Sequence, residues 1–357
     1  MSGPVARINL AALRHNLARV REAAPGCKVI TAIKADGYGH GMLQTARALE
    51  GADGWAVARV EEALTLRKAG FGKRIMVLEG FASLPELMLC RDSDLDLVIH
   101  DHSQLQLLGK RPDGKQPLRL WVKVDTGMHR VGIQPVEAPA IIEQLRQLHD
   151  VELVGVMTHF ANADDRNSDY TNRQLETFAP FMDPAIEVSI ANSAGILAWK
   201  GSHRGWVRPG IMLYGSSPFG DSTAAEEGLQ PVMTLRTKLI AVRRLQKGDM
   251  IGYGSTFTCP VEMPVGVAAI GYGDGYPRHV PNGTPVLVNG ERAAIAGRVS
   301  MDMITIDLRT IHNPRVGDKV VLWGEGLPAE EIAQAAGTIT YELFCRLTSR
   351  VKFRYEE

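Results

Sequence analysis

The chain has 357 residues, with 40 Lys plus Arg against 40 Asp plus Glu, so its formal net charge is zero. Because the charges balance and no run of five basic residues occurs, the composition gives no support for binding to nucleic acid or to a membrane surface. The four cysteines form no C-x-x-C pair, which argues against a disulfide framework and a zinc site, so we expect no metal. With no secretory or membrane-spanning segment evident, we expect a cytoplasmic protein of two domains that acts on a small molecule.

The first part of the chain alternates strand-like and helix-like segments. A short strand at residues 6–10 precedes a helix whose leucines recur at helical spacing, and Asn9 is a candidate for its cap. Eight strand-like runs follow, at residues 29–33, 54–58, 75–78, 95–99, 118–124, 151–158, 186–190 and 206–208. Helical segments between most of them predict a parallel sheet covered by helices. Eight such units favour an α/β fold that closes into a (β/α)8 barrel of the TIM type.

The pattern changes after residues 219–228, a polar, glycine-containing stretch that is typical of a connection. Short strands then follow at residues 232–242, 265–271, 284–288, 293–297, 303–307 and 319–322, with one helix at 329–335 and a final strand at 350–355. We therefore expect a barrel domain over residues 1–225 and a mainly β C-terminal domain over residues 226–357. The N-terminal strand is free to pair with this second domain.

Lys34 stands where the first barrel strand should end. The strand is apolar and partly β-branched, and a turn rich in glycine follows it. An ammonium that is only partly hydrated there loses its proton readily, so Lys34 is a candidate to form a Schiff base with an aldehyde. Tyr38 could return its hydroxyl to the same ligand, and the glycines let the backbone approach it. The competing interpretation is an ordinary surface lysine that opens a loop.

Four later strand ends also carry polar side chains, which would share one mouth of the barrel with Lys34. They are Lys123, Asp125 and Arg130 after the fifth strand, His159, Asp164 and Asp165 after the sixth, Asn192 and Ser193 after the seventh, and Arg208 and Gly210 after the eighth. The Ser193 hydroxyl and free backbone N–H groups near Ser193 and residues 210–211 suit an anion. A phosphorylated aldehyde cofactor fits both the anion site and the lysine.

Seven motifs in this order resemble those of the alanine racemase family, enzymes that use pyridoxal 5'-phosphate (PLP) and consist of a barrel and a β domain. The resemblance covers essentially the whole chain and implies racemisation between L-alanine and D-alanine. It also implies a homodimer with shared active sites. The motifs are AIKADGYGHG, VKVDTGMHRVG, THFANAD, VRPGIMLYG, IGYGSTF, GYGDGYPR and GRVSMDM.

The resemblance implies two catalytic bases. Lys34 would hold the cofactor and act on D-alanine, and Tyr253 from the neighbouring subunit would act on L-alanine, with His159 and Arg208 as its relay. Racemisation removes a proton from one face of a planar carbon and returns it to the other, which two bases on opposite faces do directly. If Tyr253 comes from the partner, a monomer is expected to be nearly inactive.

The resemblance assigns further residues by their positions in the motifs. Arg208 would face the pyridine nitrogen; because a guanidinium keeps its proton, the ring becomes a weaker electron sink, and we expect transamination to be suppressed. Arg130 would bind substrate, and Lys123, if carbamylated, would supply a negative charge that orients Arg130. Met301 would contact substrate from the partner chain through its backbone, and Asp302 beside it would hold either Arg130 or the entrance network. The cofactor-binding set is Lys34, Tyr38, His159, Ser193, Arg208, Gly210 and Ile211, and the entrance set is Asp164, Tyr272, Arg278 and Arg298.

One position departs from the family pattern. Some members have a tyrosine at the inner gate where this chain has Ser349, so we expect a somewhat more open gate. Three other functions remain open from the sequence: a broad-specificity amino-acid racemase, a related decarboxylase, and a non-catalytic PLP-binding protein. The roughly 130 residues after the barrel argue against the last. A role in supplying D-alanine for peptidoglycan and a role in D-alanine catabolism require the same catalytic residues.

Overall fold

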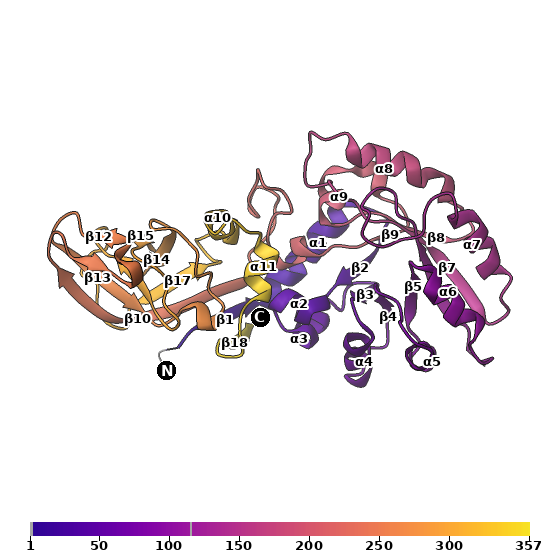
Figure 1. The fold of residues 1–357 in the computed structure, drawn as a ribbon, viewed down its shortest axis with the longest axis horizontal. Coiled ribbons are helices and arrows are strands. Elements are labelled where there is room, and N and C mark those ends of the chain that lie inside the picture. The colour runs from indigo at the N-terminus through magenta and orange to yellow at the C-terminus, as the bar shows by residue number, and fades with distance from the viewer. Residues whose placement is uncertain (1–2, 115) are drawn as a thin grey trace.

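The computed structural model describes residues 3–114 and 116–357. Figure 1 shows two lobes, a barrel built from the first part of the chain and a twisted sheet built mainly from the last part. The long strand β10 (Met233–Leu245) runs from the junction of the lobes into the second lobe, and β1 (Val5–Asn9) pairs with it antiparallel. The N-terminal strand therefore belongs to the sheet of the second lobe, although the chain then returns to the barrel.

The barrel consists of eight parallel strands and is closed by pairing between its last strand and its first. The strands are β2 (Lys28–Ala32), β3 (Gly54–Val57), β4 (Arg74–Val77), β5 (Asp96–Ile99), β6 (Leu118–Lys123), β7 (Val151–Met157), β8 (Glu187–Ser189) and β9 (Trp206–Val207). This confirms the predicted TIM-type barrel. Its interior is filled by apolar side chains that include Met76, Trp121 and Trp206, as expected for a packed barrel core.

Helices cover the outside of the barrel. They are α1 (Leu10–Ala23), α3 (Met42–Ala48), α4 (Val60–Lys68), α5 (Leu84–Asp92), α6 (His102–Gly109), α7 (Ala138–Arg146), α8 (Tyr170–Phe178) and α9 (Ser193–Ala198). The predicted cap of α1 is confirmed, because Asn9 Oδ1 accepts a hydrogen bond of 2.9 Å from the Ala12 N–H, which satisfies one of the free donors at the helix start.

The second lobe is mainly β, as predicted. Its eight-stranded sheet has the order β13-β16-β15-β14-β17-β10-β1-β18, with β13 also paired to β10. The strands not yet given are β13 (Met263–Ala268), β14 (Pro285–Val288), β15 (Glu291–Ile295), β16 (Ile304–Asp307), β17 (Lys319–Trp323) and β18 (Lys352–Glu356), and the short pair β11 (Met250–Ile251) and β12 (Phe257–Thr258) lies outside this sheet. The predicted helix at 329–335 is α10 (Ala329–Ala335).

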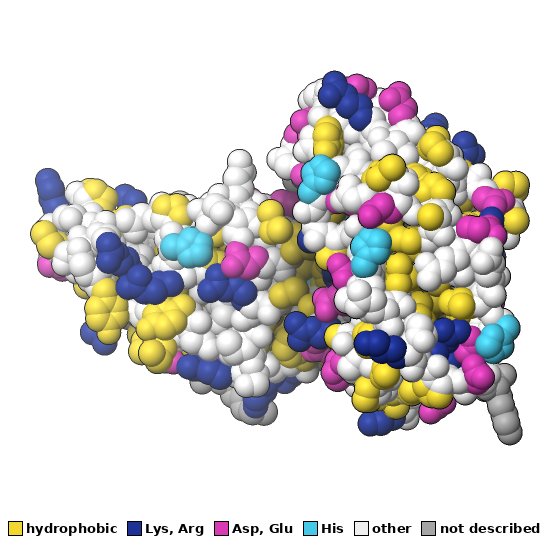
Figure 2. Space-filling model, turned by 45° about the vertical axis from the view of Figure 1, so that its right-hand side comes forward, with side chains coloured by type: hydrophobic (Ala, Val, Ile, Leu, Met, Phe, Trp, Pro, Cys, Tyr) yellow, Lys and Arg dark blue, Asp and Glu magenta, His cyan; other side chains and the backbone are white. Residues whose placement is uncertain are grey.

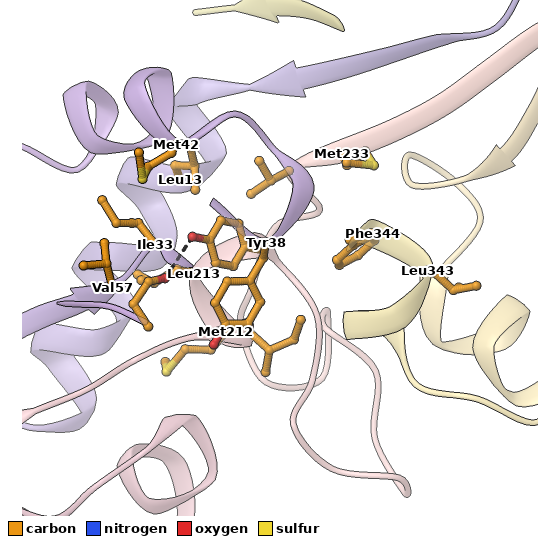
Figure 3. Close-up of a cluster of buried hydrophobic side chains, with 14 of the residues drawn as sticks. Leu13, Ile33, Tyr38, Met42, Val57, Met212, Leu213, Met233, Leu343 and Phe344 are labelled. Atoms are coloured by element: carbon orange, nitrogen blue, oxygen red, sulfur yellow. Dashed lines mark hydrogen bonds between the residues drawn. The ribbon is translucent and has the colours of Figure 1, made fainter. Parts of the chain in front are cut away.

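A short helix, α11 (Thr340–Cys345), was not predicted, and it joins the two lobes next to Lys34. Figure 3 shows Tyr38 in one apolar cluster with barrel side chains such as Ile33 and with Phe344 of α11. The approach is close, because a Cβ on Gly39 would lie 2.2 Å from the Phe344 carbonyl oxygen. Only glycine fits at this point, and the turn after Lys34 is thereby packed against the second lobe.

The surface carries charges of both signs. On the face in Figure 2, Lys and Arg predominate over Asp and Glu on the β lobe, whereas both signs are mixed on the barrel lobe. Within the described ranges, every helix is too short or too polar to cross a lipid bilayer.

Candidate active site

The segment that carries Lys34 turns with the opposite hand to an ordinary helix. In α2 (Lys34–Gly39), the four residues from Ala35 to Tyr38 have φ between 52° and 63°. A left-handed conformation costs roughly 1–2 kcal/mol for each residue other than glycine, and such strain is often found at functional sites. The sequence predicted a glycine-rich turn here, but the non-glycine residues that adopt this conformation gave no signal.

Two carboxylates hold this turn in place. Glu62 Oε1 accepts a hydrogen bond of 2.8 Å from the Ala35 N–H, and its other oxygen accepts from the Ala58 N–H at 2.8 Å. Asp36 Oδ1 accepts from the Met42 N–H at 2.8 Å. These bonds tie the turn to the end of β3 and to the start of α3, and so fix the backbone from which the Lys34 side chain extends.

The Lys34 side chain is partly buried. Burial, together with the positive charge of Arg130, lowers the pKa of its amine below the ordinary value. Both causes disfavour the charged form, so a larger fraction of the amine is neutral and nucleophilic near neutral pH. The direction agrees with the argument made from its place at the strand end.

Tyr38, Ser193 and the backbone at residues 210–211 form a small cradle of hydrogen-bond donors. From the sequence we expected a free N–H at Gly210, but in the structure this N–H donates to Ser193 Oγ at 2.9 Å. The Met212 N–H donates to the same oxygen at 3.3 Å. Since Ser193 Oγ already accepts twice, its own hydrogen is left to donate. A Cβ on Gly210 would lie 2.6 Å from the Tyr38 hydroxyl oxygen, so glycine is needed to keep this cradle open.

Arg208 is a buried cation without a carboxylate partner among the described residues. Its guanidinium donates to Ser189 Oγ at 2.5 Å, to the Ile190 carbonyl at 3.3 Å and, at shorter range, to the Thr158 carbonyl. Burial lowers the pKa of Arg208 to about 10, which still leaves it protonated at neutral pH. A buried guanidinium with only neutral partners is suited to donate to a further electron-rich atom.

The protonation state of His159 follows from its neighbour. Arg208 Nη2 lies 3.4 Å from His159 Nδ1, and because a guanidinium can only donate, Nδ1 accepts and the ring proton lies on Nε2. Burial and the charge of Arg208 hold the pKa of His159 well below its ordinary value. The histidine is therefore neutral at physiological pH.

Lys123 lies among three other cations at the mouth. Burial, followed by the charges of Arg208, Arg130 and Lys34, lowers the pKa of Lys123 to about 8. Arg130 is exposed and has no ion pair with Asp125, which instead accepts from the N–H groups of its own loop at Gly127 and His129. The barrel mouth thus concentrates positive charge, and an anion would relieve the repulsion.

The remaining candidates gather on one surface of the β lobe. Tyr253, Tyr272 and Met301 are 69%, 38% and 52% exposed. The Gly273 N–H donates to the Met301 carbonyl at 2.8 Å, and Arg350 bridges Asp274 and Asp302 at 3.0 Å and 2.6 Å. Arg298 lies beside the turn that carries Tyr253, because a Cβ on Gly254 would be 3.5 Å from its Nη1.

The structure does not bring Tyr253 near Lys34 within one chain. Figure 1 shows β12 at the far end of the β lobe from β2, and Tyr253 precedes β12 by four residues, a span of at most about 14 Å. The Tyr253 hydroxyl has no hydrogen bond within the described ranges. The candidate residues therefore form two groups, one at the barrel mouth and one on the β lobe.

Three other predicted positions lie at the surface. Asp164 is exposed on the loop after β7, close enough to Tyr341 for its charge to raise the pKa of that tyrosine, where burial is the larger cause. Arg278 is exposed in the loop before β14, and Ser349 is exposed between α11 and β18.

Several residues of the mouth were missed by the sequence reasoning. Ser189 and Thr158 accept from Arg208, and Glu62 holds the turn of Lys34. Ser189 had a signal, since it is a polar residue inside an apolar strand, and Glu62 had one, since it stands at the third position of a helix where a glutamate often bonds back to the cap. Thr158 acts through its backbone carbonyl and had none.

A closed barrel whose mouth holds a partly buried lysine and a small cradle of hydrogen-bond donors, followed by a second, mainly β domain, is an arrangement typical of barrel enzymes. The chain matches the family model described as alanine racemase, N-terminal domain, over residues 8–218 and the one described as alanine racemase, C-terminal domain, over residues 232–355. The chain belongs to the alanine racemase family, and it is an isomerase that interconverts the enantiomers of alanine.

Individual relatives agree with this assignment. The chain is 50% identical to an alanine racemase of Aeromonas hydrophila, over 99% of this chain and 100% of the relative, and 51% identical to one of Nitrosococcus oceani, over 98% and 99%. The biosynthetic alanine racemase of Pseudomonas aeruginosa matches with a TM-score of 0.97 and 43% identity over 100% of both chains. A structure of the Bartonella henselae enzyme with covalently bound pyridoxal phosphate matches with a TM-score of 0.90 and 29% identity, again over 100% of both chains.

Proposed function

We propose that this racemase uses PLP held by Lys34, and that Lys34 of one chain and Tyr253 of a partner chain act as its two bases in a homodimer. The observation that carries the proposal is the arrangement at the barrel mouth, where the partly buried amine of Lys34 lies with an anion cradle and with a guanidinium that has no carboxylate partner among the described residues. A lysine, three phosphate donors and a hydrogen-bond donor for a ring nitrogen are what this cofactor requires.

The residues at the mouth fit the cofactor. The hydroxyl of Tyr38, the hydroxyl hydrogen of Ser193 and the N–H of Ile211 lack acceptors among the described residues, and they would hold the phosphate beside Gly210. Arg208 would donate to the ring nitrogen without giving up its proton, and neutral His159 would pack beside the ring. When bound, PLP withdraws electrons from the α-carbon of alanine and so acidifies the hydrogen there.

The chain's own residues would move the proton. The neutral Nζ of Lys34 takes the α-hydrogen of D-alanine on one face, and the hydroxyl of the partner's Tyr253 gives a proton to the opposite face; the reverse order converts L-alanine. Tyrosine has an ordinary pKa near 10, so Tyr253 needs a positive neighbour or a hydrogen bond to act as a base. In the dimer that we propose, the His159–Arg208 pair of the barrel mouth serves as this relay.

The exposure of the β-lobe group supports a dimer. A monomer leaves Tyr253, Met301 and Tyr272 in solvent, together with the neighbouring apolar side chains of Met250 and Met303, which are 66% and 46% exposed. Exposed apolar residues that gather on one surface mark an interaction site. Seating this surface on the barrel mouth of a second copy would bring Met301 and Asp302 to the substrate, and a monomer would be nearly inactive.

Arg130 and Lys123 would bind and orient the substrate carboxylate. Arg130 has no anionic partner among the residues that the structure describes, and the lowered pKa of Lys123 leaves a share of its amine neutral, which is the form that reacts with carbon dioxide. A carbamate on Lys123 would replace a positive charge by a negative one and give Arg130 a partner. Asp164, Tyr272, Arg278 and Arg298 would line a narrow entrance that favours a small amino acid, and Ser349 would leave its inner gate more open.

The cellular setting is also part of the proposal. All four cysteines are free thiols, which supports a reducing compartment such as the cytoplasm. The similarity to the biosynthetic enzyme of Pseudomonas aeruginosa supports a role in supplying D-alanine for peptidoglycan.

Exchange at the α-carbon of alanine in deuterated water tests the two-base proposal. Each enantiomer is followed separately with the wild type and with Tyr253→Phe. We expect the variant to lose racemisation by roughly 10²–10⁴-fold while D-alanine still exchanges its α-hydrogen, because Lys34 is intact. Racemisation of both enantiomers at the wild-type rate would show that Tyr253 is not a base.

A further inference from the structure

Tyr214 is a buried residue to which neither the sequence motifs nor the proposed mechanism assigns a role. It ends the short helix η3 (Ile211–Tyr214), which directly follows Arg208 and Gly210, and its side chain is 0% exposed. Its ring stacks on that of Tyr38, with the ring centres 4.7 Å apart and the planes inclined by 20°. Tyr214 thus contacts one member of the phosphate cradle from the segment that carries two others.

The Tyr214 hydroxyl donates a hydrogen bond of 2.9 Å to the carbonyl of Ala32. Ala32 is the last residue of β2 and lies two residues before Lys34. Its own N–H donates to the Pro209 carbonyl at 2.9 Å, so the parallel pairing of β2 continues past the end of β9. Tyr214 therefore bonds to the strand that positions the reactive lysine.

The partner of the Ala32 carbonyl is unusual for a parallel pair. In regular parallel pairing, a residue such as Ala32, whose N–H donates to the Pro209 carbonyl, also accepts at its own carbonyl a hydrogen bond from the Ile211 N–H. Here the Tyr214 hydroxyl takes that acceptor, and the Ile211 N–H is left without an acceptor among the described residues. The hydroxyl thus replaces a backbone donor and makes the Ile211 N–H available to a ligand.

The Tyr214 ring also contacts a second aromatic side chain, His40. The rings of His40 and Tyr214 have their centres 4.7 Å apart, and His40 meets Phe344 of α11 edge-on at 5.1 Å. His40 Nδ1 lies 2.9 Å from the Tyr38 carbonyl and donates to it, since burial lowers the pKa of His40 to about 4 and the ring is neutral. The ring of Tyr214 is therefore packed against the rings of both Tyr38 and His40.

We propose that Tyr214 is a positioning residue for the phosphate of the cofactor: its hydroxyl occupies the Ala32 carbonyl so that the Ile211 N–H faces the phosphate, and its ring fixes Tyr38 beside it. The inference rests on the proposed PLP site. A positioning role differs from a packing role in what it affects: loss of the Tyr214 hydroxyl should weaken binding of the phosphate and leave binding of the aldehyde at Lys34 unchanged.

Tyr214→Phe isolates the hydroxyl, because the ring and its stacking are retained. Without the hydroxyl, the Ala32 carbonyl competes for the Ile211 N–H, and the phosphate loses part of one donor. We expect the affinity of the holoenzyme for PLP to fall roughly 5–20-fold, in line with the loss of one hydrogen bond to a charged group. We expect no change in the affinity for pyridoxal, which has the aldehyde but no phosphate.

The affinities are measured by dialysing the holoenzyme against decreasing concentrations of PLP, and by displacing PLP with pyridoxal. Tyr38→Phe, which removes a hydroxyl of the cradle itself, is the positive reference. Phe71→Leu is the matched control, since Phe71 is a buried aromatic residue in contact with Trp55 at the opposite end of the barrel. It should lower stability and leave both affinities unchanged.

The outcomes separate the inference from the proposed function. A selective loss of PLP affinity in Tyr214→Phe supports the positioning role. Equal losses for PLP and pyridoxal, or no loss for either, overturn it and make Tyr214 a packing residue. If the wild type itself does not retain PLP, or if Lys34→Ala retains it as firmly as the wild type, the proposed cofactor site is wrong and the inference falls with it.

Discussion

The barrel mouth and the exposed surface of the β lobe are built in opposite ways. At the mouth, Arg208 is buried and makes four hydrogen bonds, and the turn after Lys34 is held by carboxylates and by contact with α11. On the β lobe, Tyr253 and Met301 stand in solvent and the Tyr253 side chain has no hydrogen bond among the described residues. One half of the proposed site is organised by its own chain, whereas the other half is exposed in the single chain, which is why we propose that a partner covers it.

This difference separates two kinds of requirement. A cofactor must be held for many turnovers, so its donors are fixed by the fold before it binds. The second base of the proposed mechanism only has to reach the opposite face of the substrate, and in our proposal it is brought there by a surface that is exposed in the single chain. Changes at the mouth should therefore affect cofactor chemistry and stability, and changes on the β lobe should affect proton transfer.

Replacing Arg208 tests whether the mouth controls the cofactor chemistry. In Arg208→Glu, a group that can share its proton would face the ring nitrogen and make the ring a stronger electron sink. We expect the ratio of transamination to racemisation to rise roughly tenfold or more, equivalent to about 1.4 kcal/mol, as measured by pyruvate formed per racemisation event. Arg208→Lys, which keeps the charge, is the control. An unchanged ratio in Arg208→Glu would show that Arg208 does not limit transamination.

Lys123 offers a test of the positive charge at the mouth. Its pKa of about 8 lies below the ordinary 10.5, so between pH 8 and 10.5 the unfolded chain binds a proton that the folded chain does not, and stability rises with pH across this window. At pH 7 the cost of burying the charge and the repulsion by its neighbours are both fully present, and in carbon dioxide-free buffer we expect Lys123→Met to be more stable by about 2 kcal/mol after discounting for solvent screening.

Urea unfolding at a series of pH values measures this effect. The advantage of Lys123→Met should shrink as the pH rises from 8 to 10.5, and added carbon dioxide should stabilise the wild type but not the variant. Lys68→Met, which removes an exposed lysine of α4, is the control. An advantage that stays constant over this range would show that the lysine is not strained by its neighbours.

Glu62 gives the smallest expected effect and tests the left-handed turn. Glu62→Ala leaves the N–H groups of Ala35, Ala58 and Arg59 without their carboxylate acceptor, and we expect a loss of about 1–2 kcal/mol with weaker retention of PLP. The adjacent Glu61→Ala is the matched control, because the Glu61 side chain is exposed. If both variants unfold at the same urea concentration, Glu62 does not hold the turn.

The sequence predicted the architecture well because its signals are local. Each barrel strand is a short apolar run, the strands of the second lobe alternate with glycine turns, and Asn9 stands where a helix cap is expected. α11 was missed because its six residues are held by packing against the turn of Lys34, which is a tertiary effect. The left-handed turn was missed in the same way, since Ala35 and Asp36 do not favour that conformation by themselves.

For the site, the sequence identified side chains but not their bonds. The place of Lys34 at a strand end and the motif resemblance selected the residues of both groups, and the structure gathers the first group at the barrel mouth. Contacts made through backbone atoms, such as those of the Thr158 and Ala32 carbonyls, have no side-chain signature. The roles of the selected residues, and the sharing of the site between chains, remain predictions.

Mixing two inactive variants tests the shared site most directly. Lys34→Ala and Tyr253→Phe are each expected to be nearly inactive as homodimers. After unfolding together and refolding at equal amounts, random pairing makes about half of the dimers mixed, and each mixed dimer has one site with both bases intact. We expect activity to recover to about a quarter of the wild type. Activity no higher than that of either variant alone, in dimers shown to have exchanged chains, would contradict the account and place both bases in the same chain.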